Sequence, residues 1–175
     1  MFTNHSGLYR YCMGDVIEVV GWYKQAPIVQ FCYRKNQVVN IAGEKSNQEQ
    51  LTEAVRQFAF RMRCEVMGYC VQEDMSEASP RYRFYLECTD NNISGAEDIL
   101  DECLCRVNYE YQGCRKMNEI GKVRISYLRA GSFVRYEKYL AKKGKRMGQN
   151  KGVCILDTAE KKQFFAAWEN SCRQL

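Results

Sequence analysis

The chain has 175 residues, which is enough for one ordinary domain or for one domain and a fragment of another. Hydrophobic residues make up 46% of it and charged residues 27%, a balance that favours a packed core and excludes intrinsic disorder. The net charge of +5 is too small to indicate a nucleic-acid-binding domain on charge alone, and no apolar run is long enough to span a membrane.

The first predicted element is a β-hairpin. Residues 16–23 and 28–33 are rich in β-branched and aromatic side chains, which favour strands. Residues 24–27 (Lys-Gln-Ala-Pro) separate the two runs and have the composition of a hairpin loop.

A helix is expected next, because Ser46 and Glu49 have the spacing of a capping box. Its apolar face is marked by Leu51, Val55, Phe58 and Met62. Residues 64–73 and 81–88 then predict two paired strands, and strict alternation makes the second strand the clearest in the chain.

The remaining predicted elements are a helix that begins near Ser94, a strand over residues 122–129, a helix from Ser132 to about residue 143, and a last helix that begins near Asp157. Strands joined by hairpins and separated by helices predict an α+β fold. We expect a mostly antiparallel sheet with helices on one face.

Ten cysteines occur, mostly inside patterned segments, where a free cysteine acts as a small buried hydrophobe. No apolar signal sequence follows Met1, so we expect a reduced, cytoplasmic protein. The single histidine, His5, has no partner at ligand spacing and no Cys-x-x-Cys pair is present, so no metal site is expected.

Asp15 lies after Gly14 at the start of the first predicted strand. One interpretation is an ordinary turn, because glycine followed by aspartate is common in turns. The other is a binding role, because a carboxylate accepts hydrogen bonds and suits the hydroxyl groups of a ribose. Spacing alone favours the turn.

Lys151 lies in the segment Gly148-Gln149-Asn150-Lys151-Gly152, between two predicted helices. A lysine flanked by glycines carries a mobile positive charge that suits phosphate oxygens. The plain alternative is an exposed loop lysine, and considered alone that alternative is favoured.

Short segments in a fixed order connect these two places. They are Gly7-Leu8-Tyr9-Arg10 with Gly14-Asp15-Val16, Gln25-Ala26-Pro27, Phe31 to Asn36, Glu44-Lys45-Ser46-Asn47, Gly131-Ser132-Phe133, and Gly148-Gln149-Asn150-Lys151. Together they resemble the auxin-responsive family of acyl-acid amido synthetases, relatives of the acyl-adenylate-forming ligases, from about Phe2 to near the C-terminus. The family usually has Thr-Pro-Arg after the lysine, where this chain has Gly152-Val153-Cys154.

The resemblance implies a role for each matching residue. Asp15 would hold the ribose of ATP with Arg34 nearby, and Lys35 and Asn36 would form an interdomain hinge. Lys151 would be the catalytic residue, reaching phosphate and carboxylate oxygens during adenylation. The family activates a carboxylic acid with ATP and Mg and then joins it to the amine of an amino acid.

The resemblance also implies a domain organisation. Residues 1–34 would be a β-hairpin remnant of a large nucleotide-binding domain, and residues 35–175 would be the mobile small C-terminal domain. The large N-terminal domain of the same polypeptide would be the partner. Alone, this chain would bind no cofactor, would be inactive, and would expose strand edges that favour self-association.

Two alternatives come from other classes of protein. Arg81, Tyr82, Arg83 and Tyr85 along one predicted strand are compatible with a free-standing module that binds RNA or a small effector, because aromatic and arginine side chains stack on bases. No RNP-like run is present, which disfavours nucleic acid. The other alternative is a partner-binding remnant without chemistry.

Overall fold

The computed structural model describes residues 3–7, 9–10, 12, 14–34, 38–89, 94–144 and 154–169. The chain divides into two compact units, Met1–Val38 and Val39–Leu175. We call the first the hairpin unit and the second the sheet unit. None of the described helices is long and apolar enough to cross a membrane.

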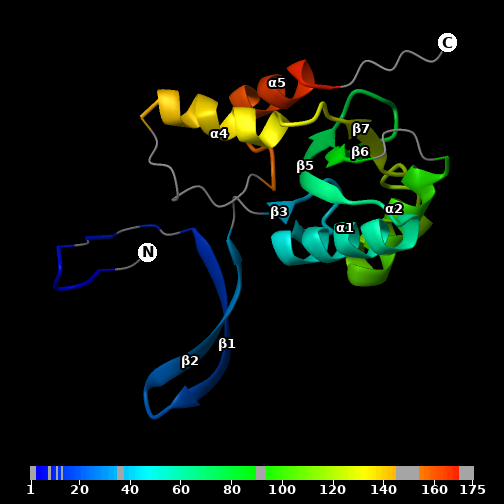
Figure 1. Ribbon diagram of the computed structural model, residues 1–175. Coiled ribbons are helices and arrows are strands. Elements are labelled where there is room, and N and C mark those ends of the chain that lie inside the picture. Colours follow the sequence, from blue (N-terminus) through cyan, green and yellow to red (C-terminus); the bar gives the residue numbers. More distant parts are fainter. Residues whose placement is uncertain are drawn as a thin grey trace. The chain divides into compact units, whose positions relative to one another are not determined.

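The hairpin unit is formed by strands β1 (Asp15–Tyr23) and β2 (Ala26–Arg34), which pair antiparallel (Figure 1). The predicted hairpin is confirmed, but its turn is only Lys24 and Gln25, with Lys24 in the left-handed region at φ 54°. Two register shifts interrupt the ladder, and such bulges increase the twist of a ribbon.

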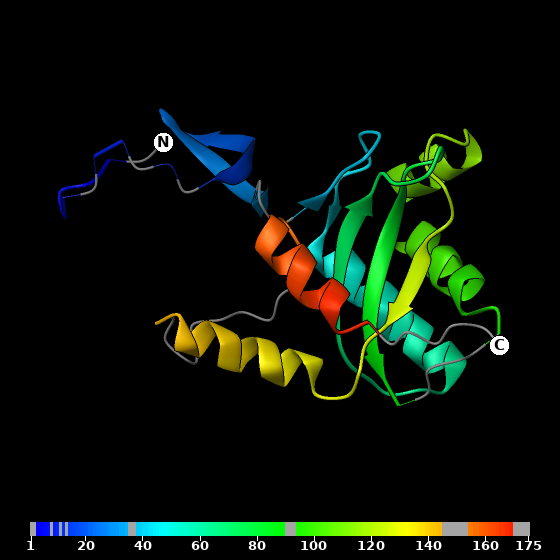
Figure 2. The same ribbon diagram turned by 90° about the horizontal axis from the view of Figure 1, so that it is seen from above.

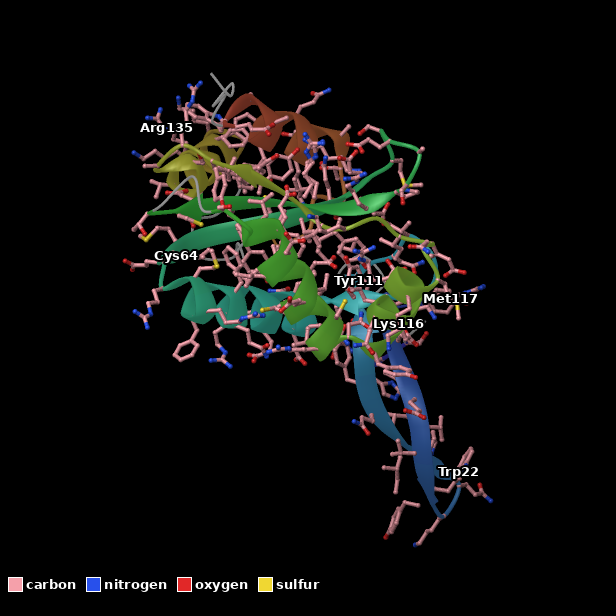
Figure 3. The ribbon with its side chains drawn as sticks, turned by 90° about the vertical axis from the view of Figure 1, so that its right-hand side faces the viewer. Trp22, Cys64, Tyr111, Lys116, Met117 and Arg135 are labelled. Carbon is pink, nitrogen blue, oxygen red and sulfur yellow. The ribbon has the colours of Figure 1, made fainter. Side chains whose placement is uncertain are left out.

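Apolar side chains cover both faces of this ribbon. Ile28 and Val29 are consecutive on β2, so they point to opposite faces, and they are 49% and 46% exposed. Trp22, near the tip of the hairpin, is 67% exposed (Figure 3). An isolated two-stranded hairpin is marginally stable in water, so this ribbon has the character of a piece of a larger sheet.

The sheet unit is built around three strands in the order β5 (Val66–Asp74), β6 (Arg81–Cys88) and β7 (Arg124–Tyr127). The β5–β6 pair is antiparallel and the β6–β7 pair is parallel. A second, two-stranded sheet joins β3 (Val38–Val39) to β4 (Ser46–Asn47).

Helices cover both faces of the three-stranded sheet (Figures 1 and 2). One face carries α1 (Gln48–Met62), α2 (Ala96–Val107) and α3 (Tyr109–Lys116), and the other carries α4 (Ser132–Lys142) and α5 (Ala159–Ala167). The reason lies in β5, where Val71 packs into one core and its neighbour Cys70 into the other. The second core is largely aromatic, with the ring of Tyr136 4.9 Å from that of Phe164 and 5.1 Å from that of Phe165.

The α+β class is confirmed, the predicted strands and all four predicted helices are present, and the described residues contain one further helix, α3. The arrangement differs in detail from the expectation, because the helices lie on both faces and β6–β7 is parallel. Helix α3 was not predicted. It contains Gly113 and buries only Tyr111, so its sequence carries little helical periodicity. In Figure 3, Tyr111 points into the body of the unit and Met117, just after α3, points outward.

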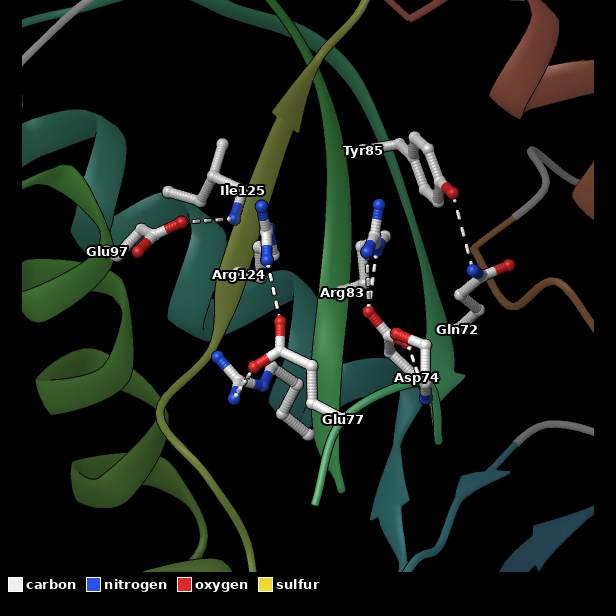
Figure 4. Close-up of polar contacts among 10 residues, drawn as sticks. Gln72, Asp74, Glu77, Arg83, Tyr85, Glu97, Arg124 and Ile125 are labelled. Carbon is white, nitrogen blue, oxygen red and sulfur yellow. Dashed lines mark hydrogen bonds and ion pairs between the residues drawn. The ribbon is translucent and has the colours of Figure 1, made fainter. Parts of the chain in front are cut away.

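The predicted helix caps are displaced. The capping box of α1 is Asn47 with Gln50, one residue later than Ser46 with Glu49. Helix α2 follows Gly95 and has no side-chain cap, while Glu97 instead accepts a hydrogen bond from the Ile125 N–H at 3.0 Å and so ties α2 to β7 (Figure 4).

A cluster of polar side chains at one end of the sheet stabilises the pairing of β5 with β6 (Figure 4). Arg83 Nε donates to Asp74 at 2.8 Å, and the Ser76 hydroxyl donates to the same carboxylate. Burial alone would raise the pKa of Asp74, but the hydrogen bonds from Ser76 and Arg83 outweigh it and lower the pKa to about 2. Asp74 therefore stays ionised well into the acid range.

We predict that Asp74→Asn lowers the free energy of unfolding at pH 7 by about 1–3 kcal/mol, because Arg83 loses its charged acceptor. The ordinary pKa of the group is 3.8, so its contribution is complete above about pH 4 and is lost as the pH falls toward 2. Urea unfolding at pH 7, 4 and 2.5 measures this. Glu77→Gln, at a more exposed ion pair with Arg124, is the control and should cost under about 1 kcal/mol. Equal losses for both variants would contradict the prediction.

Candidate functional site

Asp15 and Arg34 occupy the open end of the hairpin. They are direct partners in the β1–β2 register, although they lie far apart in the sequence. Gly14, at φ 75°, precedes Asp15 and turns the chain into β1. The backbone positions of Asp15 and Arg34 are therefore directly opposed across the two strands. The backbone thus brings together two residues for which the family resemblance implied a nucleotide role.

The other residues with predicted roles, Lys35, Asn36 and Lys151, lie outside the described residues. The described chain resumes at Cys154, three positions after Lys151. There the Cys154 carbonyl accepts a hydrogen bond from Val71 N–H at 2.8 Å, and Leu156 N–H donates to the Val71 carbonyl at 2.9 Å. The chain that follows the lysine is therefore attached to the outer edge of β5 by a short parallel bridge.

A side-chain network strengthens this attachment. The Cys154 thiol donates to the Tyr69 hydroxyl at 3.0 Å, and that hydroxyl lies 2.7 Å from Thr52 Oγ1 on α1. Burial raises the pKa of the Tyr69 phenol well above its usual value and raises the pKa of the Cys154 thiol to about 11. Both groups therefore remain protonated, and they act as hydrogen-bonding contacts rather than as acids or nucleophiles at neutral pH.

These residues line a cavity of about 590 Å³ between α1, β5 and α4. On one side the Phe133 ring lies so close to Gly68 that a Cβ there would be 2.5 Å from the ring, so only glycine fits. Sequence reasoning missed Tyr69, Thr52 and Cys154 as a group. The one available signal was the glycine inside a predicted strand, which marks a close approach.

The described residues contain no group of three His, Cys, Asp or Glu side chains that could hold a metal ion. The structure disfavours RNA binding by β6, the strand that carries Arg81, Tyr82, Arg83 and Tyr85. Tyr82 and Tyr85 are 0% and 2% exposed, so their rings are not accessible to bases, and Arg81 and Arg83 are engaged by Glu77 and Asp74.

Comparison with known proteins gives the two units separate matches. A model of the GH3 family C-terminal domain matches residues 49–160, and a model of the GH3 family central domain matches residues 1–34. The chain is 33% identical over 141 residues to a GH3 domain-containing protein of Mus musculus, a match that covers 76% of this chain and 26% of that protein.

Two plant relatives show similar values. Jasmonoyl–L-amino acid synthetase GH3.5 of Oryza sativa subsp. japonica is 31% identical over 140 residues, covering 76% of this chain and 24% of the relative. The 4-substituted benzoates–glutamate ligase GH3.12 of Arabidopsis thaliana is 29% identical over 190 residues, covering 94% and 33%. A solved structure of GH3.15 acyl acid amido synthetase superposes with a TM-score of 0.69 and 26% identity, covering 97% of this chain and 33% of that one. The chain spans about a quarter to a third of the length of these proteins.

We predict that Cys154 resists alkylation near neutral pH, because its thiol is buried and its pKa is about 11. Iodoacetamide labelling followed by peptide mass spectrometry should modify the exposed Cys12 at least about ten times faster at pH 7.5. Tyr69→Phe removes the hydroxyl acceptor and should speed labelling of Cys154. Equal labelling of Cys12 and Cys154 in the unsubstituted protein would show that the segment after Lys151 is not attached to β5.

Proposed function

The chain belongs to the GH3 family, and from this premise we propose that it is the C-terminal part of an ATP-dependent acyl acid amido synthetase. The observation that carries the proposal is the order of the two matches, a central-domain piece over residues 1–34 followed by the C-terminal domain over 49–160. Relatives named as amido synthetases and ligases support it.

In this proposal ATP supplies the adenylyl group that activates a carboxylic acid, pyrophosphate leaves, and the amine of an amino acid then displaces AMP to form the amide. Asp15 accepts hydrogen bonds from the ribose hydroxyls, and Arg34 adds positive charge on the nucleotide side. The opposed backbone positions of these two residues at the end of the hairpin support a shared role.

Lys151 is proposed as the catalytic residue, whose ammonium donates to phosphate and carboxylate oxygens as charge develops there. Lys35 and Asn36 are proposed as the hinge that carries the small domain between the two half-reactions. The hydrogen bonds between Cys154 and β5 support the proposal that the lysine moves with the small domain, because they attach the chain just after Lys151 to the sheet unit. ATP and Mg are proposed as cofactors of the full-length enzyme, and the chain alone is expected to bind neither.

We propose that residues 1–34 are part of the large domain and that residues 35–175 are the small domain. The apolar side chains on both faces of the hairpin support this, because they need further strands to cover them. The large N-terminal domain of the same polypeptide is the proposed partner. One wall of a two-domain cleft does not exclude water, so the 175-residue chain alone should be inactive.

The eight cysteines described as free thiols support a reducing, cytoplasmic location.

The first test uses the polypeptide that joins the large domain to this chain. Lys151→Ala should lower kcat for pyrophosphate release by about 100-fold or more, while KM for ATP changes by less than about threefold, because the ammonium acts on developing charge. Lys143→Ala is the matched control, since it also removes a lysine ammonium but one that lies directly after α4 and pairs with Glu160 on the surface. An unchanged rate in Lys151→Ala would reject the assigned role.

A second test concerns the hairpin in the isolated chain. We expect the chain to self-associate through this ribbon, and Trp22→Ser with Phe31→Thr should shift it toward monomer in light scattering at equal concentration. Phe60→Ser is the control, because Phe60 is 82% exposed on α1 in the sheet unit. The hairpin assignment fails if Phe60→Ser has the larger effect.

A further inference from the structure

A buried carboxylate lies where the chain enters the sheet unit. Glu44 is 1% exposed, and its two oxygens accept hydrogen bonds from the N–H groups of Ile41 and Ala42, each at 2.7 Å. The Tyr82 hydroxyl on β6 donates to the same carboxylate at 2.5 Å. Within the described part of the chain no cation pairs with Glu44, and these three donors are the hydrogen-bond partners of its carboxyl group.

The same cluster includes a hydroxyl and an amide from separate elements. Ser46, at 0% exposure, places its oxygen 3.1 Å from the Tyr82 hydroxyl. The Asn108 amide, between α2 and α3, donates to Ser46 Oγ at 2.8 Å and to the Glu44 carbonyl at 3.1 Å. The Tyr82 hydroxyl also lies 3.0 Å from the Val39 carbonyl. The contacts therefore hold both ends of the segment 39–46.

The hydrogen bonds among Glu44, Ser46, Tyr82 and Asn108 favour one arrangement of residues 39–46, the one that lies against β6. Moving residues 39–46 away from β6 would leave the buried Glu44 side chain without its donors, and an unsatisfied buried polar group destabilises the arrangement that contains it. Burial also keeps Tyr82 protonated, because it raises the pKa of the phenol far above its usual value, and Tyr82 therefore remains a donor to Glu44 across the working pH range.

The position of the cluster connects it to the proposed hinge. Lys35 and Asn36 precede Val39 by four and three positions, so the cluster holds the part of the chain that directly follows the proposed hinge. Tyr82 lies on β6, which pairs with β5, and β5 holds Cys154 after the lysine segment. The hinge end and the lysine end of the small domain thus meet on two adjacent strands.

We propose that Glu44 is a positioning residue that fixes the small-domain end of the hinge, so that rotation moves the sheet unit and the attached lysine segment as one body. This inference rests on the proposed function for its consequence in catalysis. Its structural content, that Glu44 holds residues 39–46 in place, does not depend on that function.

The structural content is tested by hydrogen–deuterium exchange on the 175-residue chain. Glu44→Gln should speed amide exchange over residues 39–46 by about tenfold or more and leave α4 unchanged. Glu87→Gln is the matched control, because Glu87 is also a buried carboxylate but accepts from Gly131 and Phe133 N–H at the start of α4. It should speed exchange only there.

Tyr82→Phe keeps the ring and removes the hydroxyl donor, so it provides the same test if Glu44→Gln does not fold. Residues 39–46 should again exchange faster than in the unsubstituted chain. Unchanged exchange over this segment in the variant that folds would overturn the proposal.

The catalytic consequence is tested in the polypeptide that includes the large domain. Measured as separate half-reactions in a single turnover, amide formation from the acyl-adenylate should slow by about tenfold in Glu44→Gln, while pyrophosphate release from acid and ATP without amine falls by less than about threefold, because the hinge acts in the passage between the half-reactions. If amide formation and pyrophosphate release fell by the same factor, Glu44 would have only a structural role, and its proposed role in the hinge would be overturned. If the unsubstituted enzyme releases no pyrophosphate, the proposed function fails, and the exchange experiment alone decides whether Glu44 anchors the segment.

Discussion

The sheet unit depends on one pair of strands, β5 and β6, that is buried on both faces. Val71 and Phe84 pack into the core beneath α1 and α2, while their neighbours Cys70 and Tyr85 pack into the core beneath α4 and α5. The main chain of Val71 also holds the segment that follows Lys151. Because side chains alternate strictly along a strand, a shift of one residue would exchange the two cores, so this register determines where every other element can lie.

The sequence predicted which segments form helices and strands better than it predicted which faces of those segments are buried. Alternation along residues 81–88 identified β6, but it also suggested one face in water, because Arg83, Tyr85 and Glu87 end in polar groups. In the structure those polar ends are satisfied by Asp74, by Gln72 and by N–H groups at the start of α4, so the second face is covered as well. Polarity at the tip of a long side chain does not show whether its stem is exposed.

The candidate site was predictable only where local geometry determines it. A short hairpin turn sets the register that places Asp15 opposite Arg34. The contact of Cys154 with Tyr69 joins positions 85 residues apart, and the contact of Thr52 with Tyr69 joins positions 17 apart, so no local pattern signals either. Glu44 is similar, because a charged residue before a helix is normally solvated, and only the folded chain shows Tyr82 and the Ile41 and Ala42 N–H groups around it.

The two outer strands of the three-stranded sheet differ from the hairpin in how their edges end. Ile155 bridges to Val71 along β5, and Glu169 bridges to Leu128 just beyond β7. Both bridges come from the last part of the chain, which thereby caps main-chain groups that would otherwise template edge-to-edge aggregation. A chain that stopped before Cys154 would contain the residues of all three strands but would lack both of these bridges. The last described residues therefore cover main-chain groups at both outer edges of the sheet as well as packing against it.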